Sequence, residues 1–386
     1  MKWRETTLGA LCREGGGGIQ TGPFGSQLHA SDYVLTGVPS VMPQNIGDNV
    51  IHAEGIARIL ESDAQRLSRY RVRTGDIVYS RRGDVEKRAL VREANEGWIC
   101  GTGCLRVRLG DHSTHDPAFL SYLLGTEESR EWIVRHAVGA TMPNLNTAIL
   151  SAVPLTVPEP PVQRAIAEVL GALDDKIAAN TKLAATAEAL GRALFQNSTA
   201  GPEAVTVKLG HVAKNVAGRY LSKDHYAGDG PYFIYGSNSI MGRHDRALCQ
   251  GGFAVLAKIG SYCGNLRWSQ RPAWVNNNAS AIVPSDGTEP SILRHALDRI
   301  DMTPHKAGTG QPYIRMESLF SATLTVPSPE AAAAIAPALE NLSEIEARSR
   351  EENTTLSAMR NALLPQLMSG KLRVQDSEKV LENAGA

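Results

Sequence analysis

The most constraining feature of this sequence is an internal duplication. Residues 139–194 align with residues 308–363 at one constant shift, so that Pro143 matches Pro312 and Leu194 matches Leu363. Within this alignment the segment Leu-Thr-Val-Pro at residues 155–158 recurs at residues 324–327. The repeat is far longer than the unit of about 20–50 residues that builds a solenoid. We therefore expect two copies of one unit, each made of a globular domain followed by a helix.

Each copy ends in an apolar pattern with helical spacing. Apolar residues recur mostly at steps of four and three, which is the spacing of a coiled-coil seam. In the first copy they are Ile166, Leu170, Leu173, Ile177, Leu183, Ala187, Leu190 and Leu194, and in the second Ile335, Leu339, Leu342, Leu356, Met359 and Leu363. A helix of this length, about 50 Å, cannot bury its stripe alone. We predict that the two helices pack antiparallel and that a pseudo-twofold axis relates the copies.

The segments outside the helices predict two domains of mixed structure. Short β-branched and aromatic runs between glycines, such as residues 77–80 and 105–109, indicate strands, and residues 119–124 look helical. We expect an α+β fold with two mixed α/β domains joined by the two long helices. The expected boundaries are 1–154 for the first domain, 155–200 for the first helix, 201–325 for the second domain, 326–374 for the second helix and 375–386 for a disordered tail.

Charge and cysteine content narrow the class of protein. The chain has 40 basic and 40 acidic residues, which argues against binding nucleic acid by bulk electrostatics alone. It has no apolar run of membrane-spanning length, and its polar start predicts no secretory leader. The five cysteines form no Cys-x-x-Cys pair, so we expect reduced thiols in the cytoplasm. Cys100 and Cys104 have histidines nearby, but the spacing suits zinc poorly.

Motifs for catalysis are missing from the sequence. It contains no phosphate-binding loop of the Gly-x-x-x-x-Gly-Lys type and no hydrolase or zinc-protease motif. Asp174 and Lys176 have the Asp-x-Lys spacing of some metal-dependent nucleases, but they lie on the predicted long helix without a second acid nearby. We interpret them as a solvated helix face. The sequence thus favours a binding protein without a catalytic or metal site.

Glycine-rich loops and clusters of polar side chains are the candidates for contact with DNA. Lysines and backbone amides suit phosphates, while Arg, Asn and Gln pair with base edges. In the first domain the candidates are Gln20, Thr21, Ser26, Arg81, Arg82, Lys87 and Arg88. In the second they are Arg219, Tyr220, Asn238, Lys258, Asn265, Lys306 and Gln311. The alternatives are plain connecting loops, Asn-rich turns and solvated surface arginines.

Several of these segments resemble those of one family, the specificity subunits of type I restriction-modification systems. The resembling pieces are residues 20–26, 75–80 and 308–314, the Pro-rich start of each helix, and residues 364–370. Their order, duplication and spacing cover nearly the whole chain. The family often has Glu-Gln at the helix start, whereas this chain has Val162-Gln163 in the first copy and alanines at 331–334 in the second.

The resemblance implies two target recognition domains held apart by the helix pair, each reading half of a split double-stranded DNA target. Two methyltransferase subunits using S-adenosylmethionine and restriction motor-nuclease subunits using ATP and Mg would be its partners, with no cofactor in this chain and no membrane. The exposed helix faces would dock the methyltransferase subunits, with Glu340, Glu344, Glu351 and Glu352 as a polar rim. Two globular domains separated by about 50 Å would span more than one turn of B-DNA, about 34 Å.

Two other functions fit the same organisation. One is a two-lobed adaptor in which both domains bind proteins and neither contacts DNA. The other is a fused restriction enzyme, which the missing catalytic motifs disfavour. A filter-binding assay with random duplex DNA, with and without a methyltransferase partner, would separate these functions from the one that the resemblance implies.

Overall fold

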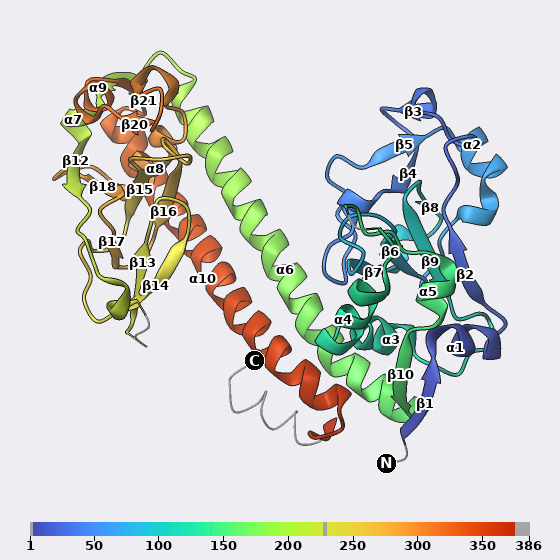
Figure 1. The fold of residues 1–386 in the computed structure, drawn as a ribbon. Coiled ribbons are helices and arrows are strands. Elements are labelled where there is room, and N and C mark those ends of the chain that lie inside the picture. Colours follow the sequence, from blue (N-terminus) through green and yellow to red (C-terminus); the bar gives the residue numbers. More distant parts are fainter. Residues whose placement is uncertain (1–2, 140, 227–229, 375–386) are drawn as a thin grey trace. The chain divides into compact units, whose positions relative to one another are not determined.

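The computed structural model describes residues 3–139, 141–226 and 230–374, and the tail expected at 375–386 lies outside this range. The chain divides into two compact units, unit 1 (residues 1–176 and 356–386) and unit 2 (residues 177–355). Both units combine helices with sheets, which confirms the α+β fold class. The long helices α6 (Pro160–Thr199) and α10 (Pro329–Met368) each contribute to both units (Figure 1).

The domain of unit 1 contains two four-stranded sheets, with strand orders β2-β9-β6-β7 and β3-β5-β4-β8. Its strands are β1 (Trp3–Thr7), β2 (Gly18–Thr21), β3 (Tyr33–Val34), β4 (Val38–Val41), β5 (Ala57–Ile59), β6 (Ile77–Ser80), β7 (Arg88–Leu90), β8 (Ile99–Cys100), β9 (Cys104–Arg108) and β10 (Pro154–Pro158). Its helices are α1 (Leu8–Glu14), α2 (Glu61–Arg66), α3 (Pro117–Leu123), α4 (Glu127–His136) and α5 (Thr147–Ser151). β1 pairs antiparallel with β10, the strand that leads into α6. The first strand and the start of the long helix are therefore fastened together.

The domain of unit 2 has a four-stranded sheet, β12-β18-β15-β16, and a three-stranded sheet, β14-β13-β17. Its strands are β11 (Val205–Lys208), β12 (Ala213–Ala217), β13 (Tyr232–Tyr235), β14 (Ile240–His244), β15 (Phe253–Ala257), β16 (Leu266–Ser269), β17 (Ala273–Val275), β18 (Ala279–Pro284), β19 (Lys306–Ala307), β20 (Tyr313–Ile314) and β21 (Thr323–Val326). Its helices are α7 (Leu209–Val212), α8 (Pro290–Leu297) and α9 (Met316–Phe320). β11 pairs with β21, which leads into α10.

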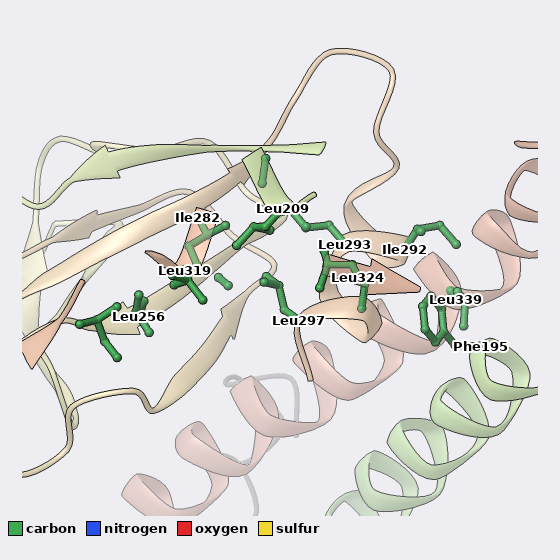
Figure 2. Close-up of a cluster of buried hydrophobic side chains, with 14 of the residues drawn as sticks. Phe195, Leu209, Leu256, Ile282, Ile292, Leu293, Leu297, Leu319, Leu324 and Leu339 are labelled. Atoms are coloured by element: carbon green, nitrogen blue, oxygen red, sulfur yellow. The ribbon is translucent and has the colours of Figure 1, made fainter. Parts of the chain in front are cut away.

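The core of unit 2 extends from its sheet into the long helices. Leu256 and Ile282 of the four-stranded sheet pack in the same buried cluster as Leu293 of α8 (Figure 2). Phe195 of α6 and Leu339 of α10, which are 1% and 0% exposed, belong to that cluster as well. The ends of both helices are therefore part of the hydrophobic core of this domain.

Matching backbone contacts confirm the duplication. The amide of Leu8 donates to a carbonyl at residue 153, and that of Leu209 donates to the one at residue 322. Gly75, just before β6, lies against Pro117 at the start of α3. In unit 2, Gly252 lies against Pro290 at the start of α8 in the same way. On these contacts β6, β7, α3 and α6 of unit 1 correspond to β15, β16, α8 and α10 of unit 2.

The two long helices run antiparallel within each unit, as predicted. In unit 1, Asp174 of α6 accepts from Arg360 of α10 at 2.8 Å. In unit 2, the Asn180 amide donates to Glu352 at 2.8 Å, and Glu188, further along α6, pairs with Arg350, further back along α10. Contacts that advance along one helix retreat along the other. The predicted pseudo-twofold axis concerns the relation between the units and stays a prediction.

Two predicted seam residues in the second half of α6 are wrong, while Ala187 is buried as predicted. Leu183 and Leu190 are each 49% exposed, whereas Ala184 and Ala187 are buried. The buried positions continue the steps of three and four through Asn180, which is 5% exposed. A polar residue within the seam therefore sets the register, and the two leucines lie one position away from it.

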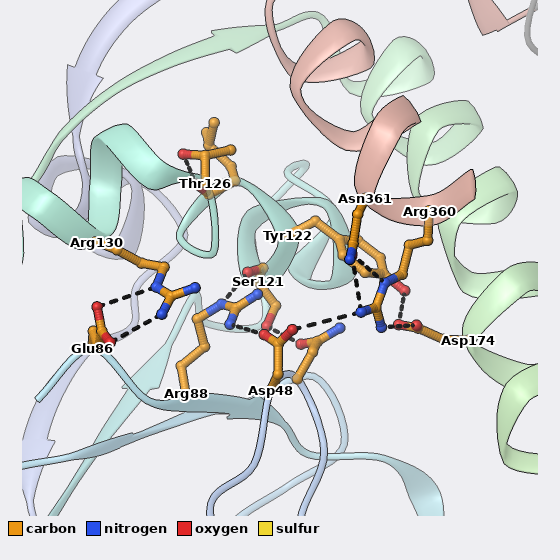
Figure 3. A network of polar contacts seen from close by, with 12 residues as sticks. Asp48, Glu86, Arg88, Ser121, Tyr122, Thr126, Arg130, Asp174, Arg360 and Asn361 are labelled. Carbon is orange, nitrogen blue, oxygen red and sulfur yellow. Dashed lines mark hydrogen bonds and ion pairs between the residues drawn. The ribbon is translucent and has the colours of Figure 1, made fainter. Parts of the chain in front are cut away.

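Ion pairs fix the domain of unit 1 to both long helices (Figure 3). Asp174 accepts from the Tyr122 hydroxyl at 2.6 Å as well as from Arg360, and Arg360 lies 3.8 Å from Asp48. Burial, together with the adjacent Asp174 carboxylate, raises the pKa of Tyr122 far above its usual range. Asp174 is thus a partly buried structural anchor, and its interpretation as a solvated helix face is wrong.

Other sequence-based expectations can be checked locally. All five cysteines are free and buried, as expected. Burial raises the pKa of Cys100 to about 12, which keeps that thiol protonated at neutral pH. Among the residues described, no cluster of His, Cys, Asp or Glu could hold a metal ion. No helix in the described part of the chain is long and apolar enough to cross a membrane.

Candidate nucleic-acid interface

In unit 1, the loop after β2 presents an exposed aromatic ring from a rigid backbone. The Gly22 amide donates to the Cys104 carbonyl at 2.9 Å, and any side chain at Gly22 would collide with the carbonyl oxygen of Gly101. Only glycine permits so close an approach. Two residues later, Phe24 is 54% exposed although it is large and apolar.

The end of β6 brings two arginines next to this loop. The Arg81 amide donates to the Gly103 carbonyl at 2.8 Å, and the Arg81 guanidinium lies 5.9 Å from the centre of the Phe24 ring. Arg82 is exposed. Because a guanidinium is attracted to the face of an aromatic ring, the contact positions a positive charge beside the exposed Phe24.

A proline-containing loop completes this surface. The Gly83 amide donates to the Pro143 carbonyl at 3.1 Å. Gly139 has a φ of 116°, and a Cβ there would lie 2.5 Å from the Met142 carbonyl oxygen. Met142 itself is 61% exposed. We call residues 22–26, residues 81–83 and residues 139 and 141–145 the three-segment surface of unit 1.

Unit 2 contains the same arrangement. The Lys258 amide donates to a carbonyl at residue 278, and the Gly260 amide donates to the Pro312 carbonyl at 2.9 Å. Gly308 has a φ of 87°, and a Cβ there would again lie 2.5 Å from a carbonyl oxygen, that of Gln311. These contacts reproduce those of Arg81, Gly83 and Gly139 in unit 1.

The glycine loop also has its counterpart. The Gly218 amide donates to the Ala279 carbonyl at 3.2 Å, and a side chain at Gly218 would collide with the Asn276 carbonyl oxygen. Two residues later Tyr220 is 74% exposed, at the position of Phe24. Residues 218–220, 258–260 and 308–314 therefore form the three-segment surface of unit 2.

Most of the residues predicted to contact DNA are accessible. The exposed ones are Ser26, Arg82, Lys87, Arg219, Tyr220, Asn238, Asn265, Lys306 and Gln311, and the half-buried ones are Gln20, Thr21, Arg81 and Lys258. Two of the side chains already have partners inside unit 1. Gln20 accepts from Arg106 at 2.7 Å, and Lys87 pairs with Asp84 at 2.7 Å.

The prediction that Arg88 contacts DNA is wrong. It is 3% exposed, its Nε donates to the Ser121 carbonyl at 2.6 Å, and its Nη1 pairs with Asp48 at 2.8 Å. Because β7 directs this side chain inward, the charge lies inside the domain and is neutralised there. Arg88 therefore stabilises the fold and cannot contact DNA.

Asn238 and Asn265 line a cavity of about 360 Å³ together with Arg267. The Arg267 guanidinium donates to the Asn238 carbonyl at 2.8 Å. Lys306 is close to Asn265, because a Cβ on the adjacent Gly264 would lie 2.7 Å from the Lys306 Cε.

The glutamates expected to form a docking rim on α10 have partners inside unit 2. Arg271 donates to Glu344 at 2.7 and 2.8 Å and to Glu351 at 3.0 Å, and Gln270 donates to Glu340. Both partners come from the domain of this unit. These carboxylates hold the domain on α10, which is a different role from a free docking rim.

The family of the chain follows from its similarity to known proteins. The model of the type I restriction modification DNA specificity domain matches residues 38–189 and again residues 202–356. The chain belongs to this family. The two matches also confirm that each copy of the duplication contains one specificity domain.

Two individual relatives are consistent with the assignment. The specificity subunit of the type I restriction enzyme HindI from Haemophilus influenzae is 26% identical over 202 residues, which cover 50% of this chain and 40% of that protein. The crystal structure of the S subunit of a type I restriction-modification system from M. genitalium superposes with a TM-score of 0.69. The two sequences are 17% identical, and the alignment covers 95% of this chain and 96% of that subunit. The comparison therefore shows that the two proteins share a fold.

Sequence reasoning missed several residues of the three-segment surface, including Phe24 and Met142. The signal was present, because Gly22 and Gly218 each precede an exposed aromatic residue by two positions. Their separation differs from the constant shift of residues 139–194, because the domains have connections of different length. A search restricted to one shift could not pair them.

Proposed function

We propose that this chain is the DNA-recognition subunit of a type I restriction-modification complex, in which each unit reads one half of a bipartite double-stranded target. The observation that carries this proposal is the recurrence of the three-segment surface on the same backbone frame in both units. The exposed side chains differ between the copies, with Phe24 in one and Tyr220 in the other. A shared frame with different side chains suits two readers of different half-sites.

The residues proposed to contact DNA follow from accessibility and chemistry. Arg82, Lys258 and Lys306 would set position on phosphates, while the amide and guanidinium side chains would contact base edges. The full proposed set is Gln20, Thr21, Ser26, Arg81, Arg82 and Lys87 in unit 1, and Arg219, Tyr220, Asn238, Lys258, Asn265, Lys306 and Gln311 in unit 2. Phe24 joins them as an aromatic platform for stacking.

The chemistry of the complex would belong to its partners. Two methyltransferase subunits would supply adenine methylation with S-adenosylmethionine, and restriction subunits would supply ATP-driven cleavage with Mg. This chain would bind these subunits and direct them to the target sequence, without methylating or cutting DNA itself. Rigorously purified protein that transferred methyl groups would contradict this division of roles.

A domain swap tests the proposal most directly. Residues 201–325 are replaced by the same segment of a relative with a different target, and the recognised sequence is determined by DNA-binding selection in the presence of methyltransferase subunits. We expect one half of the target to change and the other to stay. A change of both halves, or of neither, would refute the assignment of one half-site to each unit.

A further inference from the structure

The two units differ in the connection between one pair of corresponding strands, β4 and β5 in unit 1 and β13 and β14 in unit 2. In unit 1, residues 42–56 connect β4 with β5, while in unit 2 residues 236–239 alone connect β13 with β14. The strands correspond, because β4 also pairs in parallel with β8, as β13 does with β17. The longer connection contains a hairpin in which Ile46 pairs with Ile51. We call residues 46–51 the Asp48 hairpin.

The Asp48 hairpin places its acidic tip against the body of unit 1, where the Asp48 side chain remains 63% exposed. Asp48 pairs with Arg88 at 2.8 Å and lies 3.8 Å from Arg360 (Figure 3). Next to it, Asn49 adopts a left-handed conformation with a φ of 61°, and its side chain accepts from the Ser121 hydroxyl. The tip thus contacts β7, α3 and α10 at once.

The corresponding region of unit 2 is open. A cleft of about 710 Å³ lies among β13, β14, β16, α8 and α10. β16 and α8 correspond to β7 and α3, which the Asp48 hairpin contacts in unit 1. α10 corresponds to α6, whose Asp174 pairs with Arg360, the α10 residue beside Asp48. Trp268, Arg294 and Ser343 line the cleft from β16, α8 and α10. Unit 2 therefore lacks the hairpin, and the cleft lies where the hairpin lies in unit 1.

Two arginines in this cleft have no carboxylate partner among the residues described. The Arg243 guanidinium lies 4.3 Å from the centre of the Phe233 ring, and Arg267 lies 6.0 Å from that of Tyr235. Because residues two apart on a strand share a face, both cations lie over one face of β13. Their hydrogen bonds go to backbone carbonyls.

The other arginines of the cleft differ in this respect. Arg271, Arg294 and Arg350 each pair with at least one glutamate of α10. Charge is therefore balanced on the α10 wall of the cleft and unbalanced on the β13 wall. An anion that enters the cleft finds its complement between Arg243 and Arg267.

We propose that this cleft receives an acidic loop of a partner protein, whose carboxylate binds between Arg243 and Arg267 as Asp48 binds beside Arg88 and Arg360 in unit 1. A cleft of this volume is in the range of sites that hold a small ligand or a loop tip. Among the described residues, the α10 wall offers no unpaired positive charge to a second anion, because its arginines already pair with glutamates. A single carboxylate on a loop fits these conditions better than the repeated phosphates of a duplex.

The cleft shares no residue with the three-segment surface of unit 2. Arg267 also lines the cavity with Asn238 and Asn265, which are proposed to contact DNA, and it donates to the Asn238 carbonyl. The comparison of DNA binding therefore uses the single variant Arg243→Ala, with which the two proposals can fail separately. The natural probe is the hairpin that unit 1 already uses. A cyclised peptide of residues 45–52, labelled for fluorescence anisotropy, presents the Asp48 tip without the rest of unit 1.

The test measures binding of this peptide to the full-length chain and to three variants of the chain, which are Arg243→Ala, Arg243→Ala/Arg267→Ala and Arg246→Ala. We expect the double variant Arg243→Ala/Arg267→Ala to bind at least about tenfold more weakly, because charge-assisted hydrogen bonds are lost. The matched control is Arg246→Ala, which removes an exposed arginine that does not line the cleft. A peptide carrying Asp48→Asn should lose affinity for the unchanged chain by a similar factor. Thermal unfolding of each variant checks that the fold is intact.

Three results would overturn the proposal. The peptide could fail to bind at millimolar concentration, or the Asp48→Asn peptide could bind equally well. Arg243→Ala could also lose affinity for duplex DNA with a flatter salt dependence, which would assign the cleft to nucleic acid. Unchanged DNA binding by Arg243→Ala, together with weaker binding of the peptide, supports the proposal.

Discussion

Removal of the Glu346 carboxylate should be among the most damaging single changes in unit 2. Arg294 of α8 donates to Glu346 and, at 3.0 Å, to the Ser343 hydroxyl, both on α10. The side chains of Arg294 and Glu346 are 10% and 6% exposed. The variant Glu346→Ala leaves the buried Arg294 guanidinium with the neutral Ser343 hydroxyl as its remaining acceptor of these two.

The expected magnitude follows from burial. Breaking a buried ion pair from one side costs about 3–5 kcal/mol in the free energy of unfolding, because the remaining charge is uncompensated. Glu346 also pairs with Arg350, but Arg350 is 63% exposed, and such a pair contributes only about 0–1 kcal/mol. The variant Glu346→Gln keeps one acceptor oxygen and should lose about half as much.

The assay is urea unfolding with hydrogen exchange measured on peptides that cover α8 (Pro290–Leu297), so that the signal comes from unit 2. The control is Glu188→Ala, which removes a partly exposed carboxylate that pairs with Arg192 and Arg350 and should cost less than about 1 kcal/mol. The double variant Arg294→Met/Glu346→Leu should recover most of the stability, since apolar residues can replace a buried pair. A loss below about 1 kcal/mol for Glu346→Ala, or a double variant as unstable as the single one, would refute this reasoning.

Three further predictions concern pH, DNA binding and a loop. Burial lowers the pKa of His295 from 6.5 to about 4, so the folded state binds fewer protons than the unfolded state between these values. The stability of unit 2 should therefore fall by about 3 kcal/mol as the pH drops from 6.5 to 4, and His295→Gln should flatten this slope in pH-dependent unfolding. Arg82→Ala should weaken DNA binding in a gel-shift assay and reduce its salt dependence, without loss of stability. Arg88→Ala should instead lower the melting temperature in thermal unfolding. The reverse pattern would contradict the assignment of Arg82 to DNA contact and of Arg88 to the fold. Gly308→Ala should destabilise its loop by about 1–3 kcal/mol and speed up hydrogen exchange there, because Gly308 has a positive φ and lies close to the Gln311 carbonyl. The control is Gly310→Ala, which has open space around it and should leave hydrogen exchange of the loop unchanged.

The duplication made most of the fold predictable from sequence. A constant shift over residues 139–194 and 308–363 predicted two units and antiparallel helices, because a long apolar stripe needs a matching partner. The details of the seam were not predictable from apolarity alone. A stripe drawn from apolar residues alone omits Asn180, the polar residue in the middle of α6, which is 5% exposed and donates to Glu352. Once Asn180 is placed in the seam, the steps of three and four continue through Ala184 and Ala187.

The candidate site was less predictable for a physical reason. Residue type indicates which side chains can contact DNA, but not which face of a strand they occupy. Arg82 and Arg88 lie on the two sides of one turn, and the structure exposes the first and buries the second. Charge alone cannot separate them, because Arg88 is neutralised by Asp48, a residue distant in sequence.

In both copies the backbone of the three-segment surface is fixed by glycines, and the exposed side chains that it presents, such as Phe24 and Tyr220, differ between the copies. Gly22 and Gly218 cannot carry side chains because carbonyl oxygens occupy the space, and Gly139 and Gly308 are limited in the same way. The exposed positions that these glycines present have no such restriction, and there the copies differ. A substitution at a tip therefore changes the chemistry offered to a ligand while the backbone stays in place. If each unit reads a half-site, as we propose, a new target needs changes only at residues that the frame leaves free.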